Sequence, residues 1–335
     1  MKVTARRLFA SVALLISALD CASAANDMSM QIKRLDPALD ALIAPDAQIE
    51  RVATGFKFTE GPMWRQGRLW FSDLQNDKVL AVTPEGKVET LIEHAGGLNP
   101  FPPDSYLGPN AMVTDKDGSV LLAQHGGRRI VRLDPQLHAT SFIDRYEGKK
   151  LNSPNDLVFA PDGSLWFTDP PFGLPKMDKD PGKELSFNGV YRYSNGKLNA
   201  VITDLTLPNG LAFSPDGKTL YVANFGPARF VNAYDVGANG SLSAARTLIS
   251  YDANASGAGA PDGLKVDSKG NIWTTGSGGI RIITPKGKVL GQIVLPEVAA
   301  NLAFAEDGRT LYITASSSIY RLKLATPGTL PLYRR

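Results

Sequence analysis

Six oxygen-bearing side chains recur at one position of a repeated sequence pattern. Each is an Asn, an Asp or a Glu, and each lies seven or eight residues before a glycine in a short polar turn. The six residues are Glu60, Asn110, Asn155, Asn209, Asp262 and Asn301. If the repeats are related by rotation about one axis, these side chains form a ring at one mouth of a central channel.

Such a ring has the chemistry of a site for one hard divalent cation. Carboxylate and amide oxygens are the ligands that these ions prefer, and two carboxylates balance a charge of 2+. With one Cys and three His in the chain, a dedicated zinc cage is not indicated. Ca²⁺ is therefore the first expectation, with Zn²⁺, Mn²⁺ or Mg²⁺ as alternatives. A single Asn at such a place is often only a turn residue, so the prediction depends on the phase of all six; Asn301, without a neighbouring Pro or Gly, is the weakest member.

The elements that must position this ring are repeated β-hairpins. Apolar runs rich in Val, Leu, Phe, Trp and Tyr flank each turn glycine, and successive turn glycines are 38 to 54 residues apart. The six copies span residues 63–73, 112–124, 157–169, 211–224, 264–276 and 302–315. Each repeat has room for two further strands, such as 78–84 with 87–93 and 189–194 with 197–203. The sequence predicts an all-β, six-bladed β-propeller with four antiparallel strands per blade and the metal site on its axis. Six hairpins in phase disfavour a long β-sandwich or two unrelated β domains.

The chain ends lie outside this repeat. Residues 1–24 are predicted to be a signal peptide, because basic residues precede an apolar stretch and an Ala-Ser-Ala cleavage site. A membrane anchor and a lipoprotein at Cys21 are the alternatives. The expected location is periplasmic or secreted. A net charge of +3 with no basic run excludes nucleic-acid binding, and no membrane partner is expected after cleavage. The charge does not determine the oligomeric state.

Three further segments complete the predicted organisation. Residues 25–48 are expected to hold a short helix that starts at Asp36-Pro37, because Asp is a frequent N-cap and Pro a frequent first helical residue. The propeller is expected over residues 49–325. Its first strand, at 49–56, is predicted to pair with the last blade and so close the ring. Residues 326–335 are a C-terminal tail.

Several motifs resemble one protein family. They are FTEGPMW (58–64), QHGGRRI (124–130), SPNDLVFAPDGSLWFTDPPFGL (153–174), LPNGLAFSPDGKTLYVAN (207–224) and PDGLKVDSKGNIW (261–273). The chain resembles the SMP-30/gluconolactonase/luciferin-regenerating-enzyme-like family, and within it the bacterial gluconolactonases, from about residue 35 to 320. The resemblance implies a catalytic divalent metal whose ligands match Glu60, Asn155, Asn209 and Asp262, with proton transfer also assigned to Asp262. Two features differ from the family pattern. Some members carry an Arg at the position of Ser153. Segment 98–110 is less polar than the corresponding loop expected in a gluconolactonase.

The expected reaction is hydrolysis of a sugar lactone, with D-glucono-1,5-lactone as the first candidate. The metal would polarise the carbonyl, and Asp262 would act as general base toward water. Asn110, Asn155 and Asp156 are expected to hydrogen-bond the hydroxyl groups of the substrate.

Other readings remain open at this stage. His125 is either a substrate contact at the pocket mouth or a structural residue that fixes a loop. The long Pro-rich stretch 170–189 is a candidate lid. The same metal would also serve an arylesterase or organophosphate hydrolase, and a propeller with a purely structural metal would be a binding protein rather than an enzyme.

Overall fold

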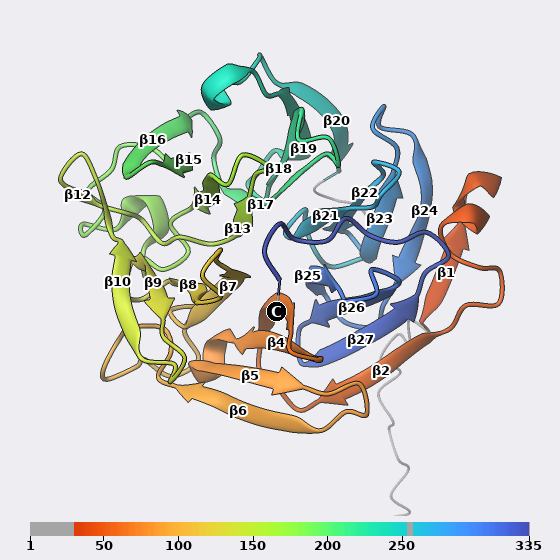
Figure 1. Cartoon of the computed structure of the whole chain (residues 1–335), viewed down its shortest axis with the longest axis horizontal. Helices are drawn as coiled ribbons and strands as arrows, with labels where there is room; N and C mark the ends of the chain where they lie inside the picture. The colour runs from red at the N-terminus through yellow and green to blue at the C-terminus, as the bar shows by residue number, and fades with distance from the viewer. Residues whose placement is uncertain (1–29, 253–256, 335) are drawn as a thin grey trace, which may run out of the picture.

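The structure, a computed structural model, describes residues 30–252 and 257–334, so the predicted signal peptide at 1–24 lies outside the described residues. Figure 1 shows six antiparallel sheets arranged around one axis, each with its innermost strand at the centre. This arrangement confirms the six-bladed propeller with four-stranded blades. No helix among the described residues is long and apolar enough to span a membrane.

The blades follow the order of the chain. Blade 1 contains β3 (Thr59–Arg65), β4 (Arg68–Asp73), β5 (Lys78–Val82) and β6 (Val88–Glu93). Blade 2 contains β7 (Pro109–Thr114), β8 (Val120–Gln124), β9 (Arg129–Leu133) and β10 (Ala139–Ile143). Blade 3 contains β13 (Leu157–Phe159), β14 (Leu165–Asp169), β15 (Gly189–Ser194) and β16 (Lys197–Ile202). Blade 4 contains β17 (Pro208–Phe213), β18 (Thr219–Asn224), β19 (Arg229–Asp235) and β20 (Arg246–Tyr251).

The last two blades each recruit a strand from the N-terminal segment. Blade 5 contains β21 (Leu264–Val266), β22 (Ile272–Gly276), β23 (Gly279–Ile283) and β24 (Val289–Val294), with β1 (Gln31–Arg34) as a fifth strand. Blade 6 contains β25 (Ala299–Phe304), β26 (Thr310–Ala315), β27 (Ser318–Lys323) and β2 (Ile49–Thr54). A small separate hairpin, β11 (Arg145–Tyr146) with β12 (Lys149–Lys150), follows blade 2.

Strand β2 closes the ring, as the sequence predicts. It pairs antiparallel with β27, so that Ile49 lies opposite Leu322 and Thr54 opposite Ser318. In Figure 1 the orange β2 runs along the outer edge of the blue β27. Because β2 comes before blade 1 in the sequence and completes blade 6, it joins the two ends of the propeller.

The segment before β2 contains the expected short helix, and its type is 3-10: η1 (Pro37–Ala41). The Asp36 side chain caps it by accepting a hydrogen bond of 2.9 Å from the backbone amide of Ala38. Leu39 and Ile43 are fully buried against blades 5 and 6. Strand β1, which precedes η1, covers the outer edge of blade 5, an arrangement that the sequence did not predict.

The hydrophobic core lies between the blades rather than on the axis. Six clusters of buried side chains are found among the described residues, and each joins two neighbouring blades. Trp166 of blade 3, for example, meets Phe213 of blade 4 edge to face, with ring centroids 5.4 Å apart. Because the apolar side chains pack between sheets, the start of each inner strand is free to carry a polar group on the axis.

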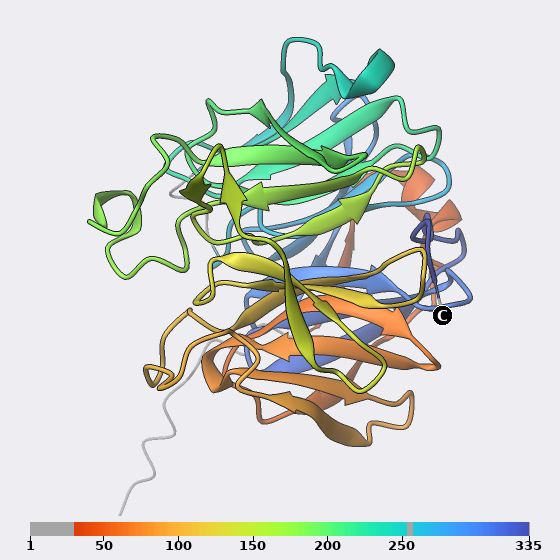
Figure 2. The same cartoon turned by 60° about the vertical axis from the view of Figure 1, so that its left-hand side comes forward.

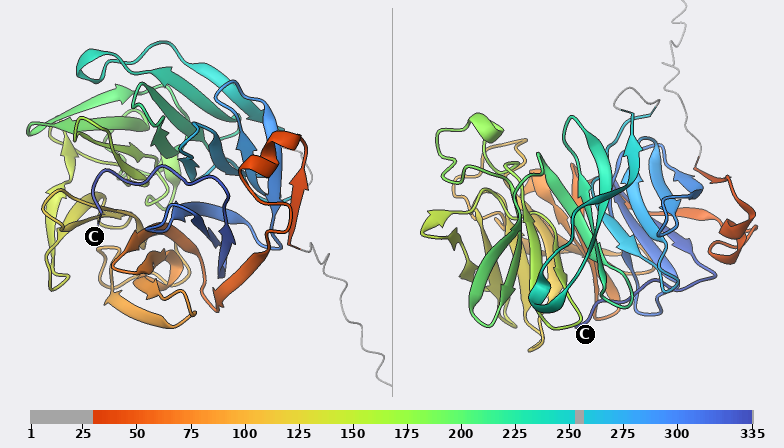
Figure 3. Two further views of the ribbon diagram at one scale, coloured as in Figure 1. Left: turned by 45° about the vertical axis from the view of Figure 1, so that its right-hand side comes forward. Right: turned by 90° about the horizontal axis from the view of Figure 1, so that it is seen from above.

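The two faces of the propeller differ in what covers them. Figure 2 shows the segments before β7 and before β15 projecting from one face, with the chain end on the opposite side. The C-terminal tail, residues 324–333, crosses that opposite face toward blade 3 (Figure 3). Hydrogen bonds of 2.8 and 2.9 Å fix it, from the amide of Gly328 to the carbonyl of Gly308 and from Thr329 to Val266. Tyr333 ends this path edge to face with Phe159, 4.9 Å away.

Candidate functional site: a polar ring on the propeller axis

The six predicted ring residues come together at the axis. Each lies at or next to the start of an inner strand, and a chain of side-chain contacts connects them. Asn110 Nδ2 donates to Asn155 Oδ1 at 2.7 Å, and Asn155 Nδ2 donates to Asn209 Oδ1 at 2.5 Å. The Asp262 carboxyl group interacts with the side chains of Asn209 and Glu60. Asn301 Nδ2 extends this chain with a bond of 3.0 Å to Glu60 Oε2.

Glycines that directly follow ring residues allow this close approach. A Cβ at Gly61, whose φ is +56°, would overlap the backbone carbonyl of Asn110 in the next blade. The same holds for Gly210, whose amide donates to the Asp262 carbonyl at 2.9 Å, and a Cβ on Gly263 would overlap the Asn301 side chain. The glycines of the TEGP, PNG and PDG motifs therefore set the distance between neighbouring inner strands at the ring.

Burial and like charge dominate the electrostatics of the ring. Five of its members are buried, and Asp262 alone is half-buried. Burial raises the pKa of Glu60 to about 7, and the charge of Asp156 adds to this effect. Burial also raises the pKa of Asp262 well above its ordinary value, and Glu60 and Asp156 act in the same direction. The site concentrates carboxylates in a poorly solvated space, which favours either bound protons or a cation.

The donor set fits a hard divalent cation. Glu60 and Asp262 supply two carboxylates that face each other, and Asn155 and Asn209 supply amide oxygens beside them. The described residues contain no group of three or more His, Cys, Asp or Glu side chains arranged to hold a metal ion, so a softer ligand cage is not present there. Two carboxylates with neutral oxygens are the combination that Ca²⁺ and similar ions take.

His125 belongs to the ring's immediate surroundings and is almost fully buried. Its Nε2 lies 3.1 Å from Asn110 Nδ2 and 3.1 Å from Asn155 Oδ1, while Nδ1 lies 2.9 Å from the carbonyl oxygen of Tyr106. Burial lowers the pKa of its imidazole. His125 thus fixes the 94–108 loop and contacts two ring amides at once, while its predicted contact with substrate stays a prediction.

Asp156 lies on the channel side of the ring, away from the mouth. Its Oδ1 accepts a hydrogen bond of 2.9 Å from the amide of Leu157. Its Oδ2 is 3.7 Å from Lys265 Nζ, which projects from the inner strand of blade 5. This placement makes Asp156 a charged neighbour of the ring carboxylates; its predicted contact with a substrate hydroxyl stays a prediction.

An aromatic wall stands beside the mouth. Phe172 lies 6.4 Å from the ring of His125 and packs edge to face with Phe225 at 5.7 Å. Ser153 holds this wall in place, because its Oγ donates to the Pro170 carbonyl at 2.6 Å and accepts from the Gly173 amide at 2.8 Å. The position that carries Arg in some relatives of the predicted family therefore anchors a loop here.

The candidate lid, residues 170–189, is tied to its surroundings at several points, and its last residue, Gly189, begins β15. Arg128 donates to the carbonyls of Leu151 and Gly182 at 2.8 and 2.7 Å. Asn188 donates to the carbonyl of Thr206 at 2.6 Å. In this conformation the stretch forms one wall of the mouth and contains one short helix, η3 (Met177–Lys179), and its role as a lid stays a prediction.

Comparison with known proteins agrees with this geometry. A family model described as "SMP-30/Gluconolactonase/LRE-like region" matches residues 58–317. The chain belongs to this family. It is 37% identical over 313 residues to a gluconolactonase of Zymomonas mobilis subsp. mobilis, covering 89% of this chain and 87% of that one. A solved gluconolactonase structure from Xanthomonas campestris is 33% identical, with a TM-score of 0.76 over 88% of this chain and 94% of the other.

A more distant structure shares the fold of the SMP-30/gluconolactonase family. It is a calcium-binding protein, regucalcin, from Agrobacterium tumefaciens, with 18% identity and a TM-score of 0.63 over 84% of this chain and 98% of that one. The family match confirms the resemblance that the motifs indicate.

Two features of this family member were not found from its sequence. Lys265 was missed although it stands three positions after Asp262, because an isolated Lys on a strand is most often solvent-exposed. The ring contact of His125 was also not predicted, since the loop that aligns it, residues 94–108, connects blade 1 to blade 2. A signal for Lys265 does exist in the sequence. An inner strand has no solvated face, so a charged residue on it is expected to have a charged or polar partner in the channel.

Proposed function

We propose that this protein hydrolyses a sugar lactone, with D-glucono-1,5-lactone as the first substrate, at the polar ring on its axis. The observation that carries the proposal is the opposed pair Glu60 and Asp262, set among amides at one mouth of the channel. The chain is a gluconolactonase-like hydrolase of its family, as the sequence predicts. The relatives named gluconolactonase match nearly its whole length, which supports the same substrate class.

Glu60, Asn155, Asn209 and Asp262 are the residues that would hold a divalent cation, and Ca²⁺ is the first choice for an all-oxygen site. When bound, the ion would polarise the lactone carbonyl. Asp262 is the only ring carboxylate with part of its surface exposed, so it is the one that substrate and water can reach. It accepts a proton as water attacks the carbonyl carbon, and it returns the proton to the ring oxygen when the carbon–oxygen bond breaks.

The remaining residues bind and position the substrate. Asn110 lies next to Asn155 at the mouth, where its amide can hydrogen-bond a sugar hydroxyl. His125 fixes both amides and the adjoining loop. The Phe172 and Phe225 wall offers an apolar surface for the carbon–hydrogen face of the sugar ring. Export to the periplasm or medium is part of the proposal and rests on the sequence of residues 1–24.

The test is acid release from D-glucono-1,5-lactone by the purified, chelator-treated protein, with and without Ca²⁺, Mn²⁺, Zn²⁺ or Mg²⁺. Hydrolysis above the spontaneous rate should require an ion. Asp262→Asn should lower kcat by about 10² to 10⁴ while the fold is retained. Glu60→Gln should weaken ion binding, so that a higher ion concentration is needed for activity. Asp216→Asn, an exposed turn variant, is the control. Tight ion binding without hydrolysis of this lactone would overturn the substrate assignment.

A further inference from the structure

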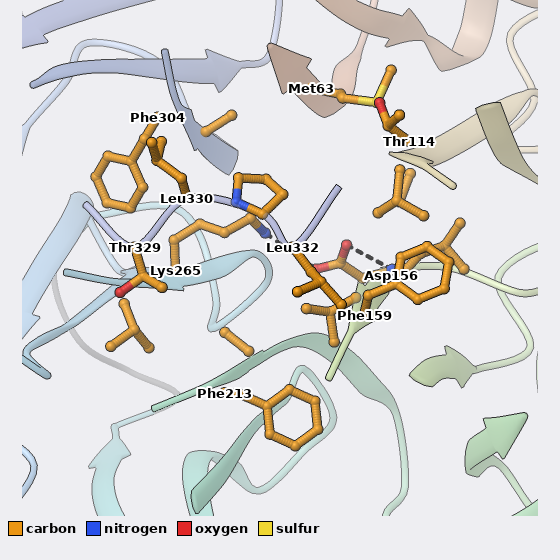
Figure 4. A pocket seen from close by; sticks show the side chains of 18 of the residues that line it. Met63, Thr114, Asp156, Phe159, Phe213, Lys265, Phe304, Thr329, Leu330 and Leu332 are labelled. Atoms are coloured by element: carbon orange, nitrogen blue, oxygen red, sulfur yellow. Dashed lines mark hydrogen bonds and ion pairs between the residues drawn. The ribbon is translucent and has the colours of Figure 1, made fainter. Parts of the chain in front are cut away.

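A cavity of about 330 Å³ lies in the central channel on the far side of the polar ring (Figure 4). Its walls are the parts of the inner strands that follow the ring residues, and the C-terminal tail covers it. Apolar side chains dominate the lining, and those labelled in Figure 4 are Met63, Phe159, Phe213, Phe304, Leu330 and Leu332. His125 and Phe172, which mark the substrate mouth, are not among its lining residues.

One end of the cavity carries the ion pair between Lys265 and Asp156. The Lys265 ammonium has three donors, and its neighbours are the Leu264 carbonyl at 3.1 Å, Asn301 Oδ1 at 3.5 Å and Asp156 Oδ2 at 3.7 Å. Only the first of these is a hydrogen bond of ordinary length. The pair therefore presents a donor and an acceptor side by side, both with capacity for a further partner.

We propose that this cavity is a second binding site, for a neutral amphiphile with an aliphatic or aromatic body and a hydroxyl head. The body would lie against the apolar walls, and the hydroxyl group would donate to Asp156 and accept from Lys265. The site is separate from the mouth at which lactones are hydrolysed. Of the six ring residues, Asn301 alone belongs to its lining.

Charge and size select this class of ligand. The two charges at the inner end already balance each other, so a carboxylate or ammonium head would bring an uncompensated charge into an apolar space. A cavity of roughly 150 Å³ holds one benzene molecule, so 330 Å³ leaves room for about twelve heavy atoms. An alcohol of eight carbons fits this space.

Access is beside the tail. Leu332 lines the cavity and still exposes 45% of its surface, so the cavity opens to solvent next to this residue. The tail is held by backbone hydrogen bonds at Gly328 and Thr329, before the lining residues Leu330 and Leu332. A ligand therefore enters from the face opposite the substrate mouth and does not compete with lactone.

The test is isothermal titration calorimetry of the whole protein with 1-butanol, 1-hexanol and 1-octanol. Saturable 1:1 binding is expected, tightening about fourfold per added methylene group because the chain is buried. Octanoate and octylammonium should bind at least about tenfold more weakly than octanol. An absence of saturable octanol binding overturns the proposal, as does equal or tighter binding of either ion.

Two variants locate the site. Leu332→Trp should place an indole in the cavity and weaken octanol binding at least about tenfold, with lactone hydrolysis unchanged. Leu35→Trp is the matched control, because Leu35 is 64% exposed outside the cavity. Lys265→Met leaves Asp156 without its partner and should shift the preference toward octylammonium. Unchanged octanol binding in Leu332→Trp overturns the assignment, even where Lys265→Met fails to fold.

Discussion

Asn301 donates a hydrogen bond of 3.0 Å from its Nδ2 atom to Oε2 of Glu60, and this contact joins the last blade to the first at the axis. Strand β2 joins the same two ends of the propeller at its outer edge through its pairing with β27. The first and last blades are thus joined both at the axis and at the outer edge. Any change that opens the propeller should also disturb the ring.

A divalent ion should stabilise the folded protein through Glu60. Because the ring exists only in the native state, an ion at 100 times its dissociation constant adds about 2.7 kcal/mol to the free energy of unfolding. We expect the thermal midpoint to rise by several degrees when Ca²⁺ is added after chelation, as measured by differential scanning calorimetry. Glu60→Gln should lose most of this shift, and exposed Glu306→Gln should keep it. An unchanged shift in Glu60→Gln would place the ion elsewhere.

Replacing His125 should affect both stability and catalysis. His125→Ala removes the imidazole partner of the Tyr106 carbonyl and of one N–H of the Asn110 amide, whose other N–H still donates to Asn155, at a cost of about 1–3 kcal/mol for each buried group left unsatisfied. Urea unfolding should show this loss, and kcat for the lactone should fall because Asn110 and Asn155 are no longer aligned. His138→Ala is the matched control, since that side chain is 78% exposed. Normal kcat in His125→Ala would show that the ring amides hold their positions without it.

Alanine substitutions at two glycines distinguish the cost of backbone strain from the cost of steric overlap at the ring. Gly61 and Gly67 both have positive φ, but a Cβ on Gly61 would overlap the Asn110 backbone, whereas a Cβ on Gly67 meets nothing within 4 Å. Gly67→Ala should therefore cost about 1 kcal/mol, and Gly61→Ala several times more, because blade 2 must move. Urea unfolding measures both. Equal costs would mean that the inner strands adjust freely at the ring.

Much of this site was predictable, because residues at the same position of successive repeats are related by rotation about the propeller axis. Glu60, Asn155, Asn209 and Asp262 share one place in the repeat, so any fold that superposes the repeats brings them together. The ring closure by β2 followed from the need to leave no open sheet edge. Features outside the repeat were not predictable. Three such features are the pairing of β1 with blade 5, the path of the tail and the contact of Lys265 with Asp156. Each depends on a long-range contact that occurs once and is not part of the sequence repeat.

Removing β2 should abolish cooperative unfolding. A chain that starts at residue 55 exposes the edge of β27 and leaves blade 6 with three strands, so broad melting and aggregation are expected. A chain that starts at residue 45 loses β1 and η1 but keeps β2, and it should still melt cooperatively at a lower temperature. Circular dichroism with light scattering follows both. A sharp transition in the shorter chain would show that β2 is not needed for closure.

Asp169 should make the fold less stable as pH rises toward neutrality. Burial raises its pKa to about 7, more than the backbone amides of Asn152 and Ser153 lower it. Below about pH 4 the carboxyl group is protonated in both states. Above that, the unfolded chain releases the proton first, so stability falls until the folded group ionises near pH 7 and is then constant.

Asp169→Asn isolates this effect, because the amide resembles the protonated acid at every pH. The free energy of unfolding of the wild type, minus that of the variant, should decrease between pH 4 and 7 by at most about 1.4 kcal/mol per pH unit. Urea unfolding at each pH measures the difference. Asp216→Asn should show no such trend, because hydrogen bonds from Ser214 and from the amide of Lys218 lower the pKa of Asp216 and leave it ionised in both states over this range. A difference that grows with pH would mean that the two amide donors, together with Arg128 and Lys183, outweigh burial and keep Asp169 ionised in the native state.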